Sequence, residues 1–166
     1  MSSLVTTAEI PFEAVGLAST FFLSGTIFSL SHITLPALRT SPAPQYTKLF
    51  APISSYGARF VPFLTLFSSI SLCYGAYVSK RSQLYNAGFL VLGIFPWSLL
   101  MLRPIQHALE AYGARRDNVW EADKDSLGDA AVVSRRWMLF NYVRSAFPLV
   151  GGIWAIRSLL LEHGGL

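Results

Sequence analysis

Four long runs of apolar residues divide the chain, and most polar residues are grouped between them. Each run approaches or exceeds the roughly 20 residues that a helix needs to cross the hydrocarbon core of a bilayer. The runs occupy about 14–36, 60–79, 84–103 and 137–160. We therefore predict an all-α protein in which residues 1–166 form a single domain, an integral membrane four-helix bundle with up-down-up-down topology.

The three connections between these runs differ in character. Pro36 and the stretch "SPAP" predict that the first helix ends there. We expect the segment that follows, up to Arg59, to fold back as a loop onto the membrane face. The short second connection, "SKRSQLYN", makes antiparallel neighbours of the helices that it joins. The third connection, about 104–136, is strongly hydrophilic and predicts a solvent-facing loop with some helix at each end.

Composition supports a membrane protein and excludes several functions. The residues are 52% hydrophobic and 13% charged, with a mean hydropathy of +0.45, whereas soluble domains carry about 25% charged residues. All 9 acidic residues lie outside the predicted spans or at their edges, which argues against a proton pump or a carboxylate-bridged di-iron site. A lone Cys73 excludes an internal disulfide. Scattered basic residues argue against a nucleic-acid partner.

The basic residues also predict how the chain is oriented. In a four-span protein, the first and third loops share one side of the membrane, and both termini share the other. The loops of the first side hold most of the basic residues: Arg39, Lys48, Arg59, Arg103, Arg115, Arg116, Lys124, Arg135 and Arg136. The positive-inside rule then makes these loops cytosolic and both termini lumenal or external. A homo-oligomer is compatible with this pattern, which does not fix the oligomeric state.

A polar stripe interrupts the last apolar run. Its members follow one another in steps of four, three and four, which puts them on one helix face: Trp137, Asn141, Arg144 and Pro148. A buried arginine costs at least about 2.5 kcal/mol by insertion scales, and a buried asparagine needs hydrogen-bond partners or water. We therefore expect the stripe to face the bundle and to line a polar pocket.

The other spans bring polar groups to the same end of the bundle. His32 lies near the end of the first span, on one stripe with the small residue Gly25, where a neighbouring backbone or a flat ligand could approach. Arg59 opens the second span at this end. Arg103 and His107 lie one turn apart where the third span ends. All four spans therefore contribute polar groups to one membrane face.

Each of these residues also has an ordinary interpretation when taken alone. Arg144 can snorkel to the interface, Asn141 can join two helices by hydrogen bonds, and Trp137 can belong to an aromatic belt. His32 can be a histidine near a helix end whose hydrogen bonds are made within the protein, and His107 can be a histidine exposed to water at the membrane boundary. Their convergence on one end favours a functional site.

Three segments resemble the anthrone oxygenase-like family of small membrane proteins. The most specific is the W-x-x-x-N-x-x-R core of "RRWMLFNYVRSAFPL", and "SHITLPAL" and "RPIQHAL" are similar to the other two family landmarks. The resemblance covers nearly the whole chain. It implies oxidation of a polyketide-derived anthrone to an anthraquinone by O₂ as co-substrate, with no flavin, metal or other cofactor. The implied partners are a hydrophobic aromatic polyketide and the lipid bilayer.

Such chemistry requires a base, groups that stabilise an oxyanion and an apolar slot for flat rings. His107 and a tyrosine such as Tyr56 or Tyr142 are alternatives for the base, but we take His32, because it lies deeper in the bundle than His107. Asn141 and Arg144 suit the oxyanion. The residues expected to bind the substrate are Trp137, His107, Trp97, Tyr56 and Arg59.

Two rival functions use the same residues. The first is a non-catalytic membrane protein, such as an assembly factor, a lipid-binding subunit or a small transporter. The second is a haem-binding bundle with His32 and His107 as axial ligands. Turnover of an anthrone distinguishes the enzyme from the first rival, and a Soret band would reveal the second.

Overall fold

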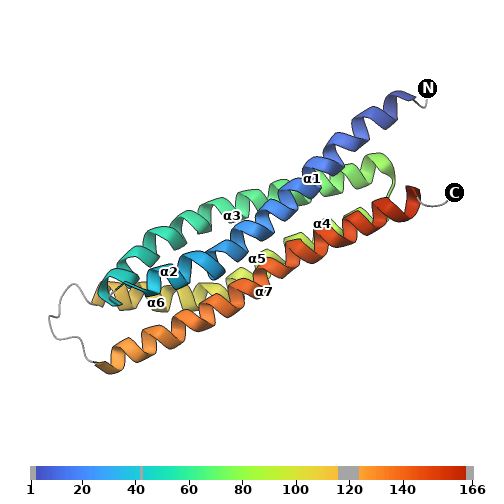
Figure 1. The fold of residues 1–166 in the computed structure, drawn as a ribbon. Coiled ribbons are helices and arrows are strands. Elements are labelled where there is room, and N and C mark those ends of the chain that lie inside the picture. Colours follow the sequence, from blue (N-terminus) through green and yellow to red (C-terminus); the bar gives the residue numbers. More distant parts are fainter. Residues whose placement is uncertain (1–2, 42, 116–123, 164–166) are drawn as a thin grey trace.

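The structure is a computed structural model that describes residues 3–41, 43–115 and 124–163. Four helical rods run side by side, and each is antiparallel to the one before it along the chain (Figure 1). In chain order the elements are α1 (Ser3–Ser29), the π-helical turn η1 (Leu30–Thr34), α2 (Leu35–Arg39), α3 (Ala43–Ser79), α4 (Ser82–Leu92), α5 (Ile94–Trp97), the π-helical turn η2 (Ser98–Leu102), α6 (Arg103–Arg115) and α7 (Lys124–His163). The first rod comprises α1, η1 and α2, and the third comprises α4 to α6.

The packing of the rods closes a four-helix bundle. α1 packs against α3 and α7, and α4 packs against the same two helices from the other side. The start of α1 and the end of α7 lie at the same end of the molecule (Figure 1). The all-α up-down-up-down bundle predicted from the apolar runs is therefore confirmed. Met1 and Leu166 themselves lie outside the described residues.

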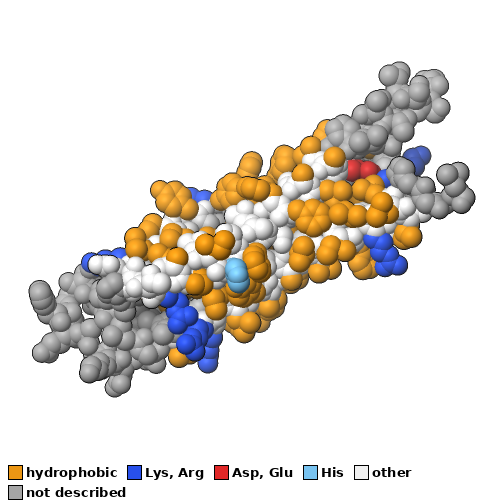
Figure 2. Space-filling model, viewed as in Figure 1, with side chains coloured by type: hydrophobic (Ala, Val, Ile, Leu, Met, Phe, Trp, Pro, Cys, Tyr) orange, Lys and Arg blue, Asp and Glu red, His pale blue; other side chains and the backbone are white. Residues whose placement is uncertain are grey.

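Three stretches of helix are long and apolar enough to cross a membrane: Phe12–Arg39, Lys48–Ser79 and Ser82–Ala111. The 40-residue α7 is not among them, and Asn141 and Arg144 interrupt its apolar sequence. Figure 2 shows hydrophobic side chains over the middle of the molecule and basic ones toward its two ends. This distribution is that of a membrane protein. Its orientation in the membrane stays a prediction.

The first connection is shorter than we predicted. The first rod continues through Pro36 to Arg39 and ends just before "SPAP", so of the two predicted stops only the second is confirmed. The expected loop up to Arg59 forms the beginning of α3 instead. Two prolines lie inside α3, at Pro52 and Pro62. Neighbouring helices and local adjustments can satisfy the backbone groups that a proline leaves free in a membrane helix, so proline there is a weaker helix stop than in water.

The hydrophilic third connection is also largely helical where it is described. α6 extends from Arg103 to Arg115, and α7 begins at Lys124, well before the predicted span. The predicted helix at each end of this connection is confirmed. Residues 116–123 lie outside the described part.

Both π-helical turns end two residues before a proline. The backbone N–H of Leu35 bonds the carbonyl of Leu30, and that of Arg103 bonds the carbonyl of Ser98. The next residues are Pro36 and Pro104. A proline ring crowds the carbonyl four residues before it, and a wider turn relieves this contact. Such turns occur frequently at functional sites.

Glycines let the rods approach closely at the level of the apolar core. A Cβ on Gly88 of α4 would lie 2.7 Å from Cys73 Sγ on α3, and one on Gly152 of α7 would lie 2.8 Å from the Phe21 ring on α1. Gly25 has no such neighbour within 4 Å. The close approach that we predicted at Gly25 is therefore wrong, because that residue faces outward.

The glycine contacts predict different costs for the same substitution at two sites. Gly88→Val should destabilise the protein by about 1–3 kcal/mol, the usual cost of overpacking, because the new side chain overlaps Cys73. Gly25→Val is the matched control, since its side chain enters open space. Thermal unfolding in detergent measures both. An equal loss of stability in the two variants would contradict the tight α3–α4 contact.

Candidate functional site

A cavity of about 340 Å³ lies inside the bundle. Its lining comes from every rod: Leu30 from η1, one face of α3, the segment from Ile94 to His107, and two residues of α7. The cavity adjoins both clusters of buried apolar side chains, one that includes Val61 and Ile94 and one that includes Leu102 and Trp137. Most of the wall is therefore apolar.

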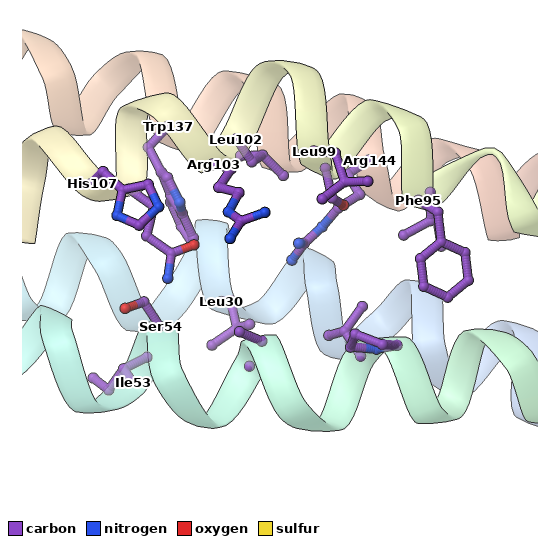
Figure 3. Close-up of a pocket in the computed structure, with 17 residues that line it drawn as sticks. Leu30, Ile53, Ser54, Phe95, Leu99, Leu102, Arg103, His107, Trp137 and Arg144 are labelled. Carbon is purple, nitrogen blue, oxygen red and sulfur yellow. The ribbon is translucent and has the colours of Figure 1, made fainter.

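Arg144 is the charged group that reaches the cavity from α7. Its side chain extends from α7 into the space between the rods (Figure 3). The Nε atom is buried and has no hydrogen-bond partner in the part of the chain that the structure describes. None of the described residues that line the cavity is acidic. The described lining therefore offers Arg144 no carboxylate, and Arg144 lines the cavity as predicted.

Trp137 forms a flat part of the wall. Its side chain is 6% exposed and packs edge to face against Phe50, with ring centroids 5.2 Å apart. Trp97 does not line the cavity. It packs against Phe140 and donates a hydrogen bond of 2.9 Å from Nε1 to the Phe140 carbonyl. Trp97 therefore holds α5 against α7, outside the slot in which we expected it.

The polar end of the cavity is formed by α6. Arg103, Gln106 and His107 line it there, and Ser54 faces them from α3 (Figure 3). The guanidinium of Arg103 and the ring of His107 point into the space between the rods. Arg103 and His107 are also exposed to the outside. This end of the cavity therefore has an opening with basic and polar groups.

Glu110, which the sequence analysis passed over, organises this opening. Its Oε1 accepts hydrogen bonds of 3.2 Å from Ser54 Oγ and from Gln106 Nε2. Its Oε2 lies 3.7 Å from His107 Nδ1, an ion-pair distance when the imidazole is protonated. The sequence contains a pattern that could have indicated this role. Glu110 follows Gln106 by four positions and His107 by three, so the three residues share one helix face. The contribution of α3 could not be foreseen because that segment was expected to be a loop.

Asn141 has a different position from the one predicted. It is fully buried, but it does not line the cavity. Its Nδ2 donates to the Ile27 carbonyl at 3.0 Å and to Ser31 Oγ at 2.7 Å. These bonds join α7 to the first rod where it enters η1. The alternative that Asn141 joins two helices is therefore the one the structure favours.

His32 lies on the outer surface, and our expectation of a bundle-facing histidine is wrong. Its ring is exposed, stacks on Phe28 with centroids 5.1 Å apart, and lies 3.0 Å from the Tyr142 hydroxyl through Nδ1. It does not line the cavity. The physical reason is helix phase: the neighbouring Ser31 is buried against Asn141, so His32 points away.

Two further predicted binding residues also lie outside. Tyr56 is 72% exposed, and Arg59 is exposed as well. Neither lines the cavity, although Ser54 and Gly57 beside them on α3 do. Because His32 faces outward while His107 lines the cavity, the two histidines do not present axial positions to one haem.

These features define a class of protein: a membrane-embedded helical bundle with an apolar-walled cavity and a buried cation. A family profile described as anthrone oxygenase matches residues 50–154. Within this range lie all the lining residues except Leu30. The chain therefore belongs to the anthrone oxygenase family.

Relatives align over nearly the whole chain. An anthrone oxygenase of Claviceps purpurea (strain 20.1) is 31% identical over 93% of this chain and 91% of its own length. Anthrone oxygenase nsrD of Aspergillus novofumigatus (strain IBT 16806) is 27% identical, over 94% of this chain and 98% of the relative. Anthrone oxygenase tpcL of Aspergillus fumigatus is 24% identical, over 90% and 94%. No solved structure matches the chain.

The Asn141 bonds predict a measurable coupling between α7 and the first rod. In a double-mutant cycle, Asn141→Ala and Ser31→Ala should be coupled by about 0.6 kcal/mol, and up to roughly 1.7, the range for such bonds in membranes. The two side chains share one hydrogen bond of 2.7 Å. Unfolding free energies in detergent measure the coupling.

Ser24→Ala provides the matched control for this cycle. Its hydroxyl also joins the same helices, through the Ser145 carbonyl, but does not contact Asn141. Its effect should add to that of Asn141→Ala within about 0.5 kcal/mol. Additivity in the Ser31 cycle as well would refute the proposed role of Asn141 as a joint between the rods.

Proposed function

We propose that this protein oxidises a polyketide-derived, hydroxylated anthrone to the corresponding anthraquinone, with O₂ as the oxidant. The observation that carries this proposal is the buried Arg144 in an apolar cavity without an acidic partner among the described residues. Family membership supports an oxygenase. The substrate and the mechanism rest on the chemistry of the cavity.

The reaction needs an anion to be stabilised where water is scarce. Loss of a proton from the methylene opposite the anthrone carbonyl gives an anion whose negative charge reaches the carbonyl oxygen. This anion passes one electron to O₂, and the resulting radical and superoxide combine at the former methylene carbon. Protonation gives a hydroperoxide, and loss of water leaves the second carbonyl. The atoms of one anthrone and one O₂ thus become one anthraquinone and one water.

Arg144 is the group that we assign to the anion. A guanidinium in an environment of low dielectric stabilises negative charge far more than it would in water. The substrate anion supplies the negative charge that the lining lacks. Trp137 offers a flat face for the fused rings, since aromatic rings prefer stacked or edge-on contacts.

His107 replaces His32 as the proposed base. Among the described residues that line the cavity it is the histidine, and a neutral imidazole can accept a proton. Glu110 lies 3.7 Å from its Nδ1 and stabilises the imidazolium that forms when the ring takes a proton. Asn141 has no direct part in this scheme, because its amide bonds the first rod.

We propose that the reaction proceeds without a metal or an organic cofactor. The support is the donor set: the described lining includes one histidine and no cysteine or carboxylate, which is a poor set of ligands for the usual metals. An anthrone anion can reduce O₂ by itself. We also retain the predicted orientation, with the α2–α3 and α6–α7 connections in the cytosol.

A non-catalytic role with the same cavity is the alternative. A bundle that only carries a flat hydrophobic molecule would need the same wall and the same cation. Purified protein in nanodiscs, supplied with emodin anthrone and O₂, distinguishes the two, because catalysis raises the rate at which anthraquinone absorbance appears above that of empty nanodiscs.

Arg144→Gln tests the proposed oxyanion site. It should lower kcat/KM for emodin anthrone by roughly 10²–10³-fold, the usual effect of removing one oxyanion donor. Arg144→Lys should retain part of the activity, because it keeps the charge but loses the shape of the guanidinium. Thermal unfolding confirms that each variant is folded. Wild-type turnover in a folded Arg144→Gln variant would remove the basis of the proposal.

The choice of base is tested by the two histidines in the same assay. His107→Ala should lower kcat at least about tenfold, since general-base help is typically worth 10²–10⁴-fold. His32→Ala should stay close to wild type, because His32 lies outside the cavity. If His32→Ala abolishes turnover and His107→Ala does not, the assignment of His107 as the base is wrong and His32 is the base.

A further inference from the structure

The third rod separates from α3 beside the cavity. α4 packs against α3 on one side of this level, and α6 packs against it on the other. Between them, α5 and η2 pack against α7 instead. Gly93 permits this lean toward α7, since a Cβ there would lie 3.0 Å from the Phe147 ring. A gap therefore remains between α3 and the α5–η2 segment.

The cavity reaches the outer surface through this gap. Ala58 on α3 and Leu99 on η2 both line the cavity and are exposed on the outside, Leu99 by 56%. Phe95 and Leu99 face α3 across the space in Figure 3. These two exposed lining residues, Ala58 and Leu99, form the rims of what we call the side opening.

The surface that continues from the rims is apolar. Pro62 and Leu66 follow Ala58 on α3 in steps of four, so they share its helix face, and Leu66 is 46% exposed. Leu100, next to Leu99 on η2, is 70% exposed. Both helices belong to stretches apolar enough to cross a membrane. In a bilayer, lipid rather than water therefore covers the side opening.

Two arginines place the side opening near the edge of the hydrocarbon. Arg59 follows Ala58 directly, Arg103 lies one turn after Leu99, and both are exposed. Long basic side chains near helix ends reach the polar headgroups. Amphipathic aromatic rings also gather at this depth, with their polar edges toward water.

We propose that ligands enter the cavity sideways from the bilayer, between α3 and η2, past the rims Ala58 and Leu99. The ligand class is a membrane-dissolved flat hydroxyaromatic molecule, and this choice rests on the proposed function. Such a molecule moves edge-on from the interface, keeps its apolar rings between apolar walls, and brings its acidic oxygen to Arg144. The route spares it a passage through water.

A bulky side chain at the rim tests the route. In phosphatidylcholine nanodiscs, stopped-flow quenching of protein fluorescence follows the binding of emodin, a hydroxyanthraquinone probe. Ala58→Trp should lower the association and dissociation rate constants by at least about tenfold each, with a much smaller change in Kd, because a barrier on the path slows both directions equally. Ala18→Trp, at an exposed position of α1, should leave both rates within about twofold.

The polar opening at α6 is the competing route. If Gln106→Trp slows both rates and Ala58→Trp does not, ligands enter from the aqueous side and the proposal is wrong. A change confined to Kd in Ala58→Trp would also overturn it, because the tryptophan would then act by filling the cavity. Absence of saturable emodin binding to the wild type would refute the side entry as well. Saturable binding without anthrone turnover would refute only the proposed function.

Discussion

A guanidinium buried in an apolar bundle is the constraint on which the site depends. Moving such a charge from water into a membrane costs several kcal/mol unless acceptors or an anion compensate it. The described lining of the cavity offers Arg144 no acidic residue. Arg144 lines a cavity, so its guanidinium faces open space that a ligand can occupy instead of closely packed apolar side chains. The anionic substrate that we propose would offset part of this cost, because opposite charges attract strongly where the dielectric constant is low.

The prolines that follow the π-helical turns explain how the cavity stays open. A regular bundle would let the third rod pack against α3 along its whole length. Instead, the turn before Pro104 widens η2, and the α5–η2 segment packs against α7. The similar turn before Pro36 lies where Leu30 reaches the cavity and Ser31 meets Asn141. The shape of the cavity thus depends on irregular turns within the helices and not on a loop between them.

The two ends of the bundle use buried polar groups differently. At the end away from the cavity, Glu13 is buried and forms an ion pair of 3.2 Å with Arg81. At the cavity end, Glu110 instead bonds Ser54 and Gln106 and lies beside His107. The first arrangement joins α1 to the α3–α4 connection. The second orders a polar opening and leaves the charge of Arg144 available.

The sequence by itself determined the class of fold, the end of the bundle that carries the site, and Arg144 and Trp137 as parts of its wall. Apolar length, spacing along one helix and the cost of buried charge depend on local sequence alone, so they can be derived from it. The tertiary structure decided that His32 faces outward, that Asn141 serves as a joint, and that the segment around Ser54 is helical. These outcomes depend on the phase of each helix against its neighbours. A π-helical turn changes that phase, and the packing of four rods determines it.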